Sequence, residues 1–142
     1  MNQEAQFCWP MRIYYEDTDA GGIVYYANYL KFFERARTEW LRHAGVNQQI
    51  MAEQQQAMFV VKSTSMDYHL PAKLDDQLRI TVVVEKLGKA SILFTQEGWR
   101  GDLCLVSGRI KVGCVDPVLV RPCAIPTNVL RAVQAQYFPV NA

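Results

Sequence analysis

The sequence lacks the features that mark several large classes of protein. Its 142 residues carry 15 basic and 14 acidic side chains, and no basic tract occurs, so a general nucleic-acid footprint is absent. No apolar stretch approaches the ~20 residues that a membrane helix needs, so we expect no membrane span. The opening residues, MNQEAQFCWP, lack the charged start and apolar run of a secretory signal. Together these absences predict a globular protein in the cytoplasm.

Metal ligands and the common nucleophile motifs are also scarce. The four cysteines form no C-x-x-C pair, which argues against a zinc site. Cys104 and Cys114 lie in apolar, strand-like sequence and are predicted to be reduced core residues. Neither of the two histidines lies in a nucleophile motif, and no G-x-S-x-G sequence occurs, so a Ser-His-Asp hydrolase is not expected. We expect no metal and no other cofactor.

The length and composition of the chain predict a single globular domain spanning 1–142. Half of the residues are hydrophobic, which suffices for a core, and a fifth are charged. A short strand is predicted over 11–16. A long helix is predicted over 26–44, because apolar side chains recur there every three or four residues. Charged residues, Arg35 and Arg37 among them, are expected on its other side.

The second half of the chain changes period and is rich in β-forming residues. After a polar turn or short helix, four strands and a terminal helix are predicted; the ranges are 47–56, then 58–68, 78–87, 91–100 and 103–115, and finally 127–136. The short connections G-K-A and R-G-D favour antiparallel hairpins. The sequence therefore predicts an α+β domain with a five-stranded antiparallel sheet. One long helix leaves sheet edges and apolar surface uncovered, so we expect a dimer at least.

The residues best suited to chemistry lie in 13–29, which read IYYEDTDAGGIVYYANY. Asp17 and Asp19 stand two residues apart, before a Gly-Gly break and the predicted helix start. A helix start offers backbone N–H donors and a positive dipole end, and a carboxylate beside such donors is suited to attack on a carbonyl. The plainer interpretation of Asp19 is a turn aspartate that binds the backbone before a glycine. We assign a structural role to Asp17.

The same stretch carries a resemblance. R-I-x4-T-D-x-x-G-I-V-Y-Y-A-N-Y resembles the active-site signature of the 4-hydroxybenzoyl-CoA thioesterase-like family of hotdog-fold enzymes. The wider run, with F-x-E-R-A-R-T-E-W-L-R-H and Y-H-L-P-A-K-L-D-D-Q-L, resembles the tol-pal-associated acyl-CoA thioesterases, the YbgC group. The resemblance covers roughly Trp9 to Pro126.

The resemblance implies a fold and a set of site residues. The fold would be a long central helix wrapped by a curved five-stranded antiparallel sheet, with active sites between paired subunits. Asp19 would be the catalytic carboxylate, acting as nucleophile or as general base. The backbone N–H of Tyr26 would hold the thioester oxygen. The YbgC group commonly has His at the position of Tyr26, so this chain lacks an imidazole there, whereas the backbone donor does not depend on the side chain.

Lys89 is a candidate for binding the phosphates of coenzyme A. It lies in a predicted hairpin turn, loosely matching a basic turn in the 4-hydroxybenzoyl-CoA branch, and coenzyme A carries several phosphate charges. A lone lysine in a turn is more often simply solvated. Lys86 and Arg100 are weaker candidates for the same role.

The function that these residues and the resemblance imply is hydrolysis of acyl-CoA to a free acid and coenzyme A. The expected partners are an acyl-CoA substrate, acyl-carrier protein as a further candidate, and other copies of the chain in a homodimer at least, with a homotetramer expected. A second hypothesis is a non-catalytic module that binds acyl-carrier protein or a lipid-synthesis partner. A third, a hotdog dehydratase, would require a histidine in the motif, and the motif has none.

Overall fold

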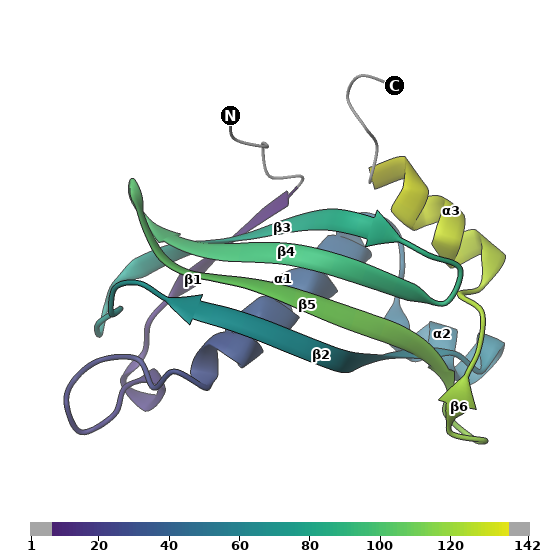
Figure 1. Ribbon diagram of the computed structural model, residues 1–142, viewed down its shortest axis with the longest axis horizontal. Helices are drawn as coiled ribbons and strands as arrows, with labels where there is room; N and C mark the ends of the chain where they lie inside the picture. Colours follow the sequence, from purple (N-terminus) through teal and green to yellow (C-terminus); the bar gives the residue numbers. More distant parts are fainter. Residues whose placement is uncertain (1–6, 137–142) are drawn as a thin grey trace.

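The structure is a computed structural model and describes residues 7–136 (Figure 1). Its elements follow in the order β1 (Phe7–Arg12), the 3-10 turn η1 (Tyr15–Asp17), α1 (Asn28–His43), α2 (Gln48–Gln55), β2 (Met58–Tyr68), β3 (Gln77–Leu87), β4 (Ser91–Arg100), β5 (Leu103–Asp116), β6 (Arg121–Pro122) and α3 (Thr127–Gln136).

The strands form one antiparallel sheet in the order β1-β3-β4-β5-β2, and the two-residue strand β6 pairs with the end of β5. The sheet is curved, and α1 crosses behind it (Figure 1). This arrangement confirms the predicted α+β hotdog architecture of a long helix against five antiparallel strands. The strand β6 was not predicted from the sequence. In this sheet β1 and β2 are the two edges, and β2 is exposed along much of its length.

The core lies between α1 and the concave face of the sheet. Phe32, Phe33, Ala36 and Trp40 of α1 are fully buried, in line with the predicted apolar stripe. Trp40 meets Phe94 of β4 edge to face, with ring centroids 5.5 Å apart. Burying each of these large side chains contributes about 1.5–3 kcal/mol relative to exposure, which holds the helix in place.

Two boundaries near the predicted site differ from expectation. The first strand covers Phe7–Arg12 rather than 11–16, because β1 pairs with β3 from Phe7↔Val82 to Arg12↔Gln77. The chain then bends at Tyr14, whose amide N–H donates to the carboxylate of Asp17 at 2.9 Å. The long helix begins at Asn28, two residues later than predicted, since residues just before it form a turn.

The remaining predicted elements agree closely with the structure. Strands β2 and β4 and the helix α3 have the predicted bounds, and β3 and β5 each gain one residue. The polar segment before β2 is the helix α2. The placement of Arg37 on the charged side of α1 was wrong, because its side chain is only 8% exposed.

The cysteines of the described part of the chain are all free thiols. Cys114 is fully buried, as predicted, whereas Cys104 is half-buried. Within residues 7–136, no helix combines the length and the apolar character needed to cross a membrane.

Candidate active site

The segment 13–27 forms a loop that projects at one end of the molecule, before α1 (Figure 1). Its arms are joined by a bridge between Thr18 and Val24, and the amide of Asp19 donates to the carbonyl of Ile23 at 2.9 Å. The loop is also bound to the β2–β3 connection, where Val24 donates to the carbonyl of Ala72 at 2.9 Å. These backbone contacts hold the loop in one shape beside the start of the helix.

Asp17 is the organising residue of this loop. It is buried, and its carboxylate accepts hydrogen bonds from the amide of Tyr14 and, at 3.2 Å, from the side chain of Asn28. Its backbone carbonyl accepts from the amide of Tyr25 at 3.2 Å. Asp17 therefore connects the turn to the first residue of α1, which supports the structural role assigned to it.

Asp19 is exposed at the tip of the same loop. One carboxylate oxygen, Oδ1, accepts from the amide of Gly21 at 2.8 Å, and Gly22 follows with φ +82°, a backbone conformation that favours glycine. The other oxygen, Oδ2, has no hydrogen bond or ion pair to any described residue. The turn interpretation thus accounts for one oxygen, while the second stays available to a substrate or a water molecule.

Tyr26 lies just outside the first turn of α1. Its carbonyl accepts from the amide of Tyr29 at 3.3 Å, but its own amide N–H has no acceptor among residues 7–136. Ala27, which precedes the helix, offers no side-chain cap. Free N–H groups at the start of a helix are donors for a ligand oxygen. The predicted donor is therefore unoccupied and lies in the same loop as Asp19.

An aromatic cluster that was not predicted from the sequence surrounds this donor. The ring of Tyr26 lies 5.0 Å from that of Tyr25 and 5.8 Å from that of Tyr68, at the end of β2. Tyr68 also lies 5.8 Å from the ring of Tyr29. Burial raises the pKa of the Tyr29 and Tyr68 hydroxyls above the ordinary value, so both stay neutral at physiological pH. No signal in the sequence connects residue 68 with the motif, because only the fold brings β2 to the helix start.

An ion pair between Arg100 and Asp76 stabilises the β2–β3 connection where it contacts the loop. Asp76 accepts from Arg100 at 2.8 Å and from the amide of Lys73 at 2.8 Å, and its carbonyl accepts from the amide of Ile13. Burial raises the pKa of the Asp76 carboxyl, but the hydrogen bonds from Lys73 and Arg100 outweigh burial and leave it below the ordinary value. Because Arg100 is held in this pair, it is less suited to binding a phosphate.

Lys89 is not close to the other predicted residues within one chain. It lies exposed in the turn between β3 and β4, where its carbonyl accepts from the amide of Ile125 at 2.8 Å. The strand β3 begins beside the loop and ends at this turn, and its 11 residues span roughly 30 Å. In one chain, the β3–β4 turn that carries Lys89 and the loop 13–27 lie at opposite ends of the sheet (Figure 1).

Comparisons with known proteins agree on one family. A family model described as Thioesterase superfamily matches residues 21–106, a range that includes Tyr26 and Lys89 and begins just after Asp19. The acyl-CoA thioesterase YbgC of Haemophilus influenzae is 50% identical over 126 residues, which cover 89% of this chain and 93% of the relative. The acyl-CoA thioester hydrolase YbgC of Escherichia coli O157:H7 is 44% identical over 126 residues, which cover 87% of this chain and 92% of the relative.

Solved structures show the same fold. A probable thioesterase from Bartonella henselae superposes with a TM-score of 0.80 at 31% identity, covering 84% of this chain and 98% of that one. A 1,4-dihydroxy-2-naphthoyl-CoA thioesterase from Synechocystis superposes with a TM-score of 0.82, covering 96% of this chain and 98% of that one. Its sequence identity is 17%, so that likeness concerns the fold alone.

Proposed function

The chain belongs to the thioesterase superfamily and is a thioester hydrolase, and on that premise we propose that it cleaves acyl-CoA thioesters with Asp19 as nucleophile or general base. The proposal rests on one observation: the loop 13–27 holds a hydrogen-bond acceptor and a hydrogen-bond donor that are both unpaired among the described residues. Asp19 has an unpartnered carboxylate oxygen, and Tyr26 has an amide N–H with no acceptor among the described residues. The first is an anion suited to attack, and the second is a donor for the oxygen that gains charge.

As a general base, Asp19 would take a proton from water while the water oxygen attacks the thioester carbonyl. The carbonyl oxygen then becomes an oxyanion, which the N–H of Tyr26 and the positive end of α1 stabilise. When the tetrahedral intermediate collapses, the C–S bond breaks and coenzyme A leaves as a thiolate that takes up a proton. As a nucleophile, the carboxylate of Asp19 would attack the thioester carbonyl, and the C–S bond would break to release coenzyme A as a thiolate that takes up a proton. Water would then hydrolyse the mixed anhydride, which releases the free acid and restores the carboxylate of Asp19. Neither route requires a cofactor.

A site of this kind would be completed by a second copy of the chain. In one chain Lys89 lies roughly 30 Å from the loop, at the far end of β3. The outer edge of β2 is exposed and offers unpaired backbone groups to another copy. We therefore keep the homodimer, and a homotetramer built from it, as part of the proposal, with Lys89 of one copy near Asp19 of the other. Acyl-carrier protein as partner and a cytoplasmic location remain predictions of the same kind.

The test is a hydrolysis panel read through released thiol. It spans short, long and aromatic acyl-CoAs together with acyl-carrier-protein thioesters, for the natural chain, for Asp19→Asn and for the control Asp102→Asn, which changes an exposed turn carboxylate. We expect Asp19→Asn to lose at least about 100-fold in kcat, the scale of a lost base, and the control to stay within about twofold. A natural chain that binds the thioesters but hydrolyses none would instead favour the non-catalytic module.

A further inference from the structure

Two of the four cysteines lie opposite each other where β6 returns along the end of β5 (Figure 1). The Sγ atoms of Cys114 and Cys123 are 3.6 Å apart, and both side chains are free thiols. The amide of Cys123 donates to the carbonyl of Cys114 at 2.9 Å. This bond continues the antiparallel pairing of β5 with β6, in which Val115 pairs with Pro122. The two cysteines are therefore cross-strand neighbours.

The turn between the two strands holds the thiols in this position. Oδ1 of Asp116 accepts from the amide of Val118 at 2.8 Å, and the carbonyl of Asp116 accepts from the amide of Val120 at 2.7 Å. Val120 has φ +53°, which a β-branched residue seldom adopts, so the surrounding contacts fix the turn in one shape. Beyond β6, the amide of Ile125 donates to the carbonyl of Lys89 at 2.8 Å. The chain is thus tied down on both sides of β6.

A disulfide fits this geometry without a rearrangement of the strands. Directly opposed residues of antiparallel strands have Cα atoms about 4.5–5.5 Å apart. Disulfides join cysteines whose Cα atoms are about 4.4–6.8 Å apart, with a bond of about 2.05 Å between the sulfurs. The sulfurs of Cys114 and Cys123 therefore have to approach by roughly 1.5 Å from their 3.6 Å separation, which rotation of the side chains can supply.

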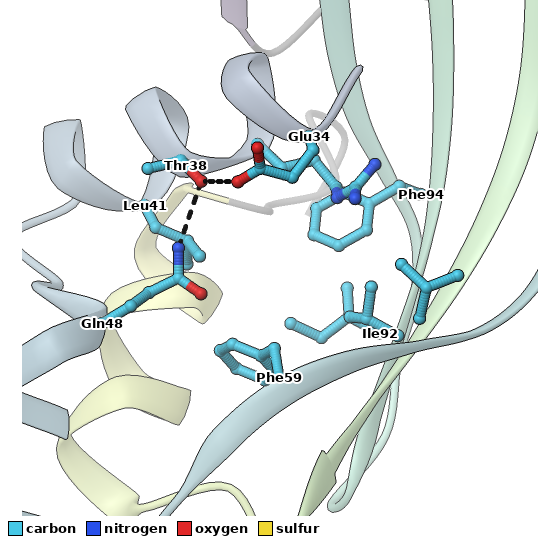
Figure 2. Close-up of a pocket in the computed structure, with 10 residues that line it drawn as sticks. Glu34, Thr38, Leu41, Gln48, Phe59, Ile92 and Phe94 are labelled. Carbon is cyan, nitrogen blue, oxygen red and sulfur yellow. Dashed lines mark hydrogen bonds between the residues drawn. The ribbon is translucent and has the colours of Figure 1, made fainter. Parts of the chain in front are cut away.

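Cys114 is the enclosed member of the pair. It is fully buried, and its Sγ donates to the carbonyl of Ala124 at 3.7 Å. Its register partner on β2 is Phe59, which lines the cavity between α1, α2 and the strands β2, β4 and β5 (Figure 2). Directly opposed side chains lie on the same face of a sheet, so Cys114 points into the interior on the side of that cavity. Burial, reinforced by Cys123, raises the pKa of the Cys114 thiol to about 12, which keeps it protonated at neutral pH.

Cys123 is the accessible member of the pair. Its side chain is half-buried, so a reagent in solution meets it before Cys114. The other two cysteines are placed differently. Cys8 lies exposed on β1, and Cys104 is half-buried at the start of β5, where its Sγ donates to the carbonyl of Val106 at 3.5 Å. Across residues 7–136, no other two cysteines have their sulfurs in contact, so this pair alone is arranged there for a bond within one chain.

We propose that Cys114 and Cys123 are a redox-sensitive site, which a small-molecule disulfide converts to a reversible intrachain disulfide. The thiolate of Cys123 attacks one sulfur of the reagent, whose S–S bond breaks and releases a small thiolate that takes up a proton. Cys114 then gives up its proton and attacks the Cys123 sulfur of the mixed disulfide, and the second small thiol leaves in the same way. Two protein thiols are oxidised, and one reagent disulfide is reduced to two thiols. An excess of the small thiol reverses both steps.

The bond would fasten the shortest strand of the sheet. β6 has two residues and, among the described strands, pairs with β5 alone, so it is expected to open more readily than the long strands. A disulfide would join the segments on either side of the turn and keep the amides of Cys123 and Ile125 beside their acceptors. Oxidation should therefore slow hydrogen exchange at these two amides and leave exchange in β3 and β4 little changed.

The test is peptide mapping of the full chain after incubation with oxidised glutathione. The thiols that remain are then blocked with N-ethylmaleimide in urea, so that buried cysteines react too. Trypsin cuts after Lys111 and Arg131 but not between Arg121 and Pro122, so one peptide, 112–131, holds both cysteines. We expect this peptide to carry no blocking group and to be lighter by two hydrogen atoms than the reduced peptide, and excess reduced glutathione should restore both thiols. A peptide that carries two blocking groups, or glutathione in place of the internal bond, would overturn the proposal.

Two alanine variants of half-buried cysteines form a matched pair. Cys123→Ala should leave Cys114 as a thiol that N-ethylmaleimide blocks, whereas Cys104→Ala should keep the intrachain disulfide. Formation of a disulfide between chains instead, seen on a non-reducing gel, would overturn the proposal.

Hydrogen exchange of the natural chain supplies a readout that needs no variant, so the proposal stays testable even if Cys123→Ala fails to fold. Exchange at the amides of Cys123 and Ile125 should slow at least about tenfold on oxidation. Unchanged exchange in a chain that carries the disulfide would overturn the role of the bond in fastening β6. None of these readouts uses thioester hydrolysis, so their outcome is independent of the role proposed for Asp19.

Discussion

Asn28 donates from its side-chain amide to both the carboxylate and the backbone carbonyl of Asp17, at 3.2 and 3.4 Å. Asn28 is the first residue of α1, and Asp17 ends the 3-10 turn within the loop 13–27. The pair therefore sets where the helix start lies relative to the loop that carries Asp19. Because Asp17 is buried, an unsatisfied oxygen there would be costly.

We predict that Asp17 and Asn28 are energetically coupled. Asn28→Ala should cost about 1 kcal/mol of unfolding free energy, and Asp17→Asn about 1–3 kcal/mol because the new amide faces the N–H of Tyr14. The coupling from a double-mutant cycle in urea should be about 0.5–1.5 kcal/mol. Strictly additive effects would show that the contact carries little energy and that another group positions the helix start.

A second prediction separates the backbone of Tyr26 from its side chain. The proposed donor is the amide N–H, and the ring is 59% exposed, so Tyr26→Phe should leave kcat within a few-fold. Tyr26→Pro removes the donor at a place where no hydrogen bond to a described residue is lost, and proline is tolerated near a helix start. We expect this variant to fold and to bind substrate but to lose on the order of 10²-fold in kcat.

The measurements are thiol release for turnover and circular dichroism for the fold. Tyr25→Phe is a suitable control variant for Tyr26→Phe, because it removes a hydroxyl from the neighbouring ring, whose centroid lies 5.0 Å from that of Tyr26. An inactive Tyr26→Phe beside an active Tyr26→Pro would assign the chemistry to the hydroxyl and remove the backbone donor from the mechanism.

The third prediction tests whether Lys89 serves the site of another subunit. Light scattering should give a mass of at least two copies of the 16.3 kDa chain. Lys89→Ala should raise the KM for acyl-CoA several-fold with little change in kcat, since the lysine would bind phosphate rather than the reacting carbonyl.

Mixing Lys89→Ala subunits with Asp19→Asn subunits tests directly whether Lys89 of one copy serves Asp19 of the other. In a shared site, the first copy supplies an intact Asp19 and the second an intact Lys89, so the hybrid should contain a site with the natural KM. Hybrids that retain the high KM of Lys89→Ala would place Lys89 outside the catalytic assembly, and a stable, active monomer would exclude a shared site altogether.

The fourth prediction concerns how the Asp76 carboxylate changes the stability of the fold with pH. Hydrogen bonds from Lys73 and Arg100 outweigh burial and hold the pKa of Asp76 below its ordinary value of 3.8. A carboxyl with a lowered folded-state pKa stabilises the protein above the unfolded pKa, and this contribution is lost as the pH falls through the folded-state pKa. Asp76→Asn should therefore lower the urea midpoint at pH 7, and its difference from the natural chain should shrink below pH 3.8.

The control for that series is Asp102→Asn, which changes an exposed carboxyl in the β4–β5 turn. It should leave the pH profile of the urea midpoint close to that of the natural chain. A difference between Asp76→Asn and the natural chain that stayed constant down to pH 2 would mean that the charge of Asp76 does not contribute.

The elements that sequence alone predicted are those governed by local periodicity. The apolar spacing of α1 and the β-rich runs of β2 and β4 were recognised because each pattern is complete within the element. The motif of residues 13–29 likewise singled out Asp17 and Asp19, since both the turn and the helix start are local features. The bounds of β1 were wrong because that strand is defined by pairing with β3, some seventy residues further along the chain.

Tertiary structure alone decided which distant groups meet. The period of α1 places Arg37 among charged neighbours, but the curved sheet closes over that side and buries it against Gln96 of β4. Tyr68 joins the ring of Tyr26 only because β2 returns to the helix start. Lys89, a plausible companion of Asp19 in the sequence, lies at the far end of β3. The physical reason is that hydrophobic burial is non-directional, so the sequence indicates which side chains are covered. The strand order and curvature of the sheet determine which groups cover them.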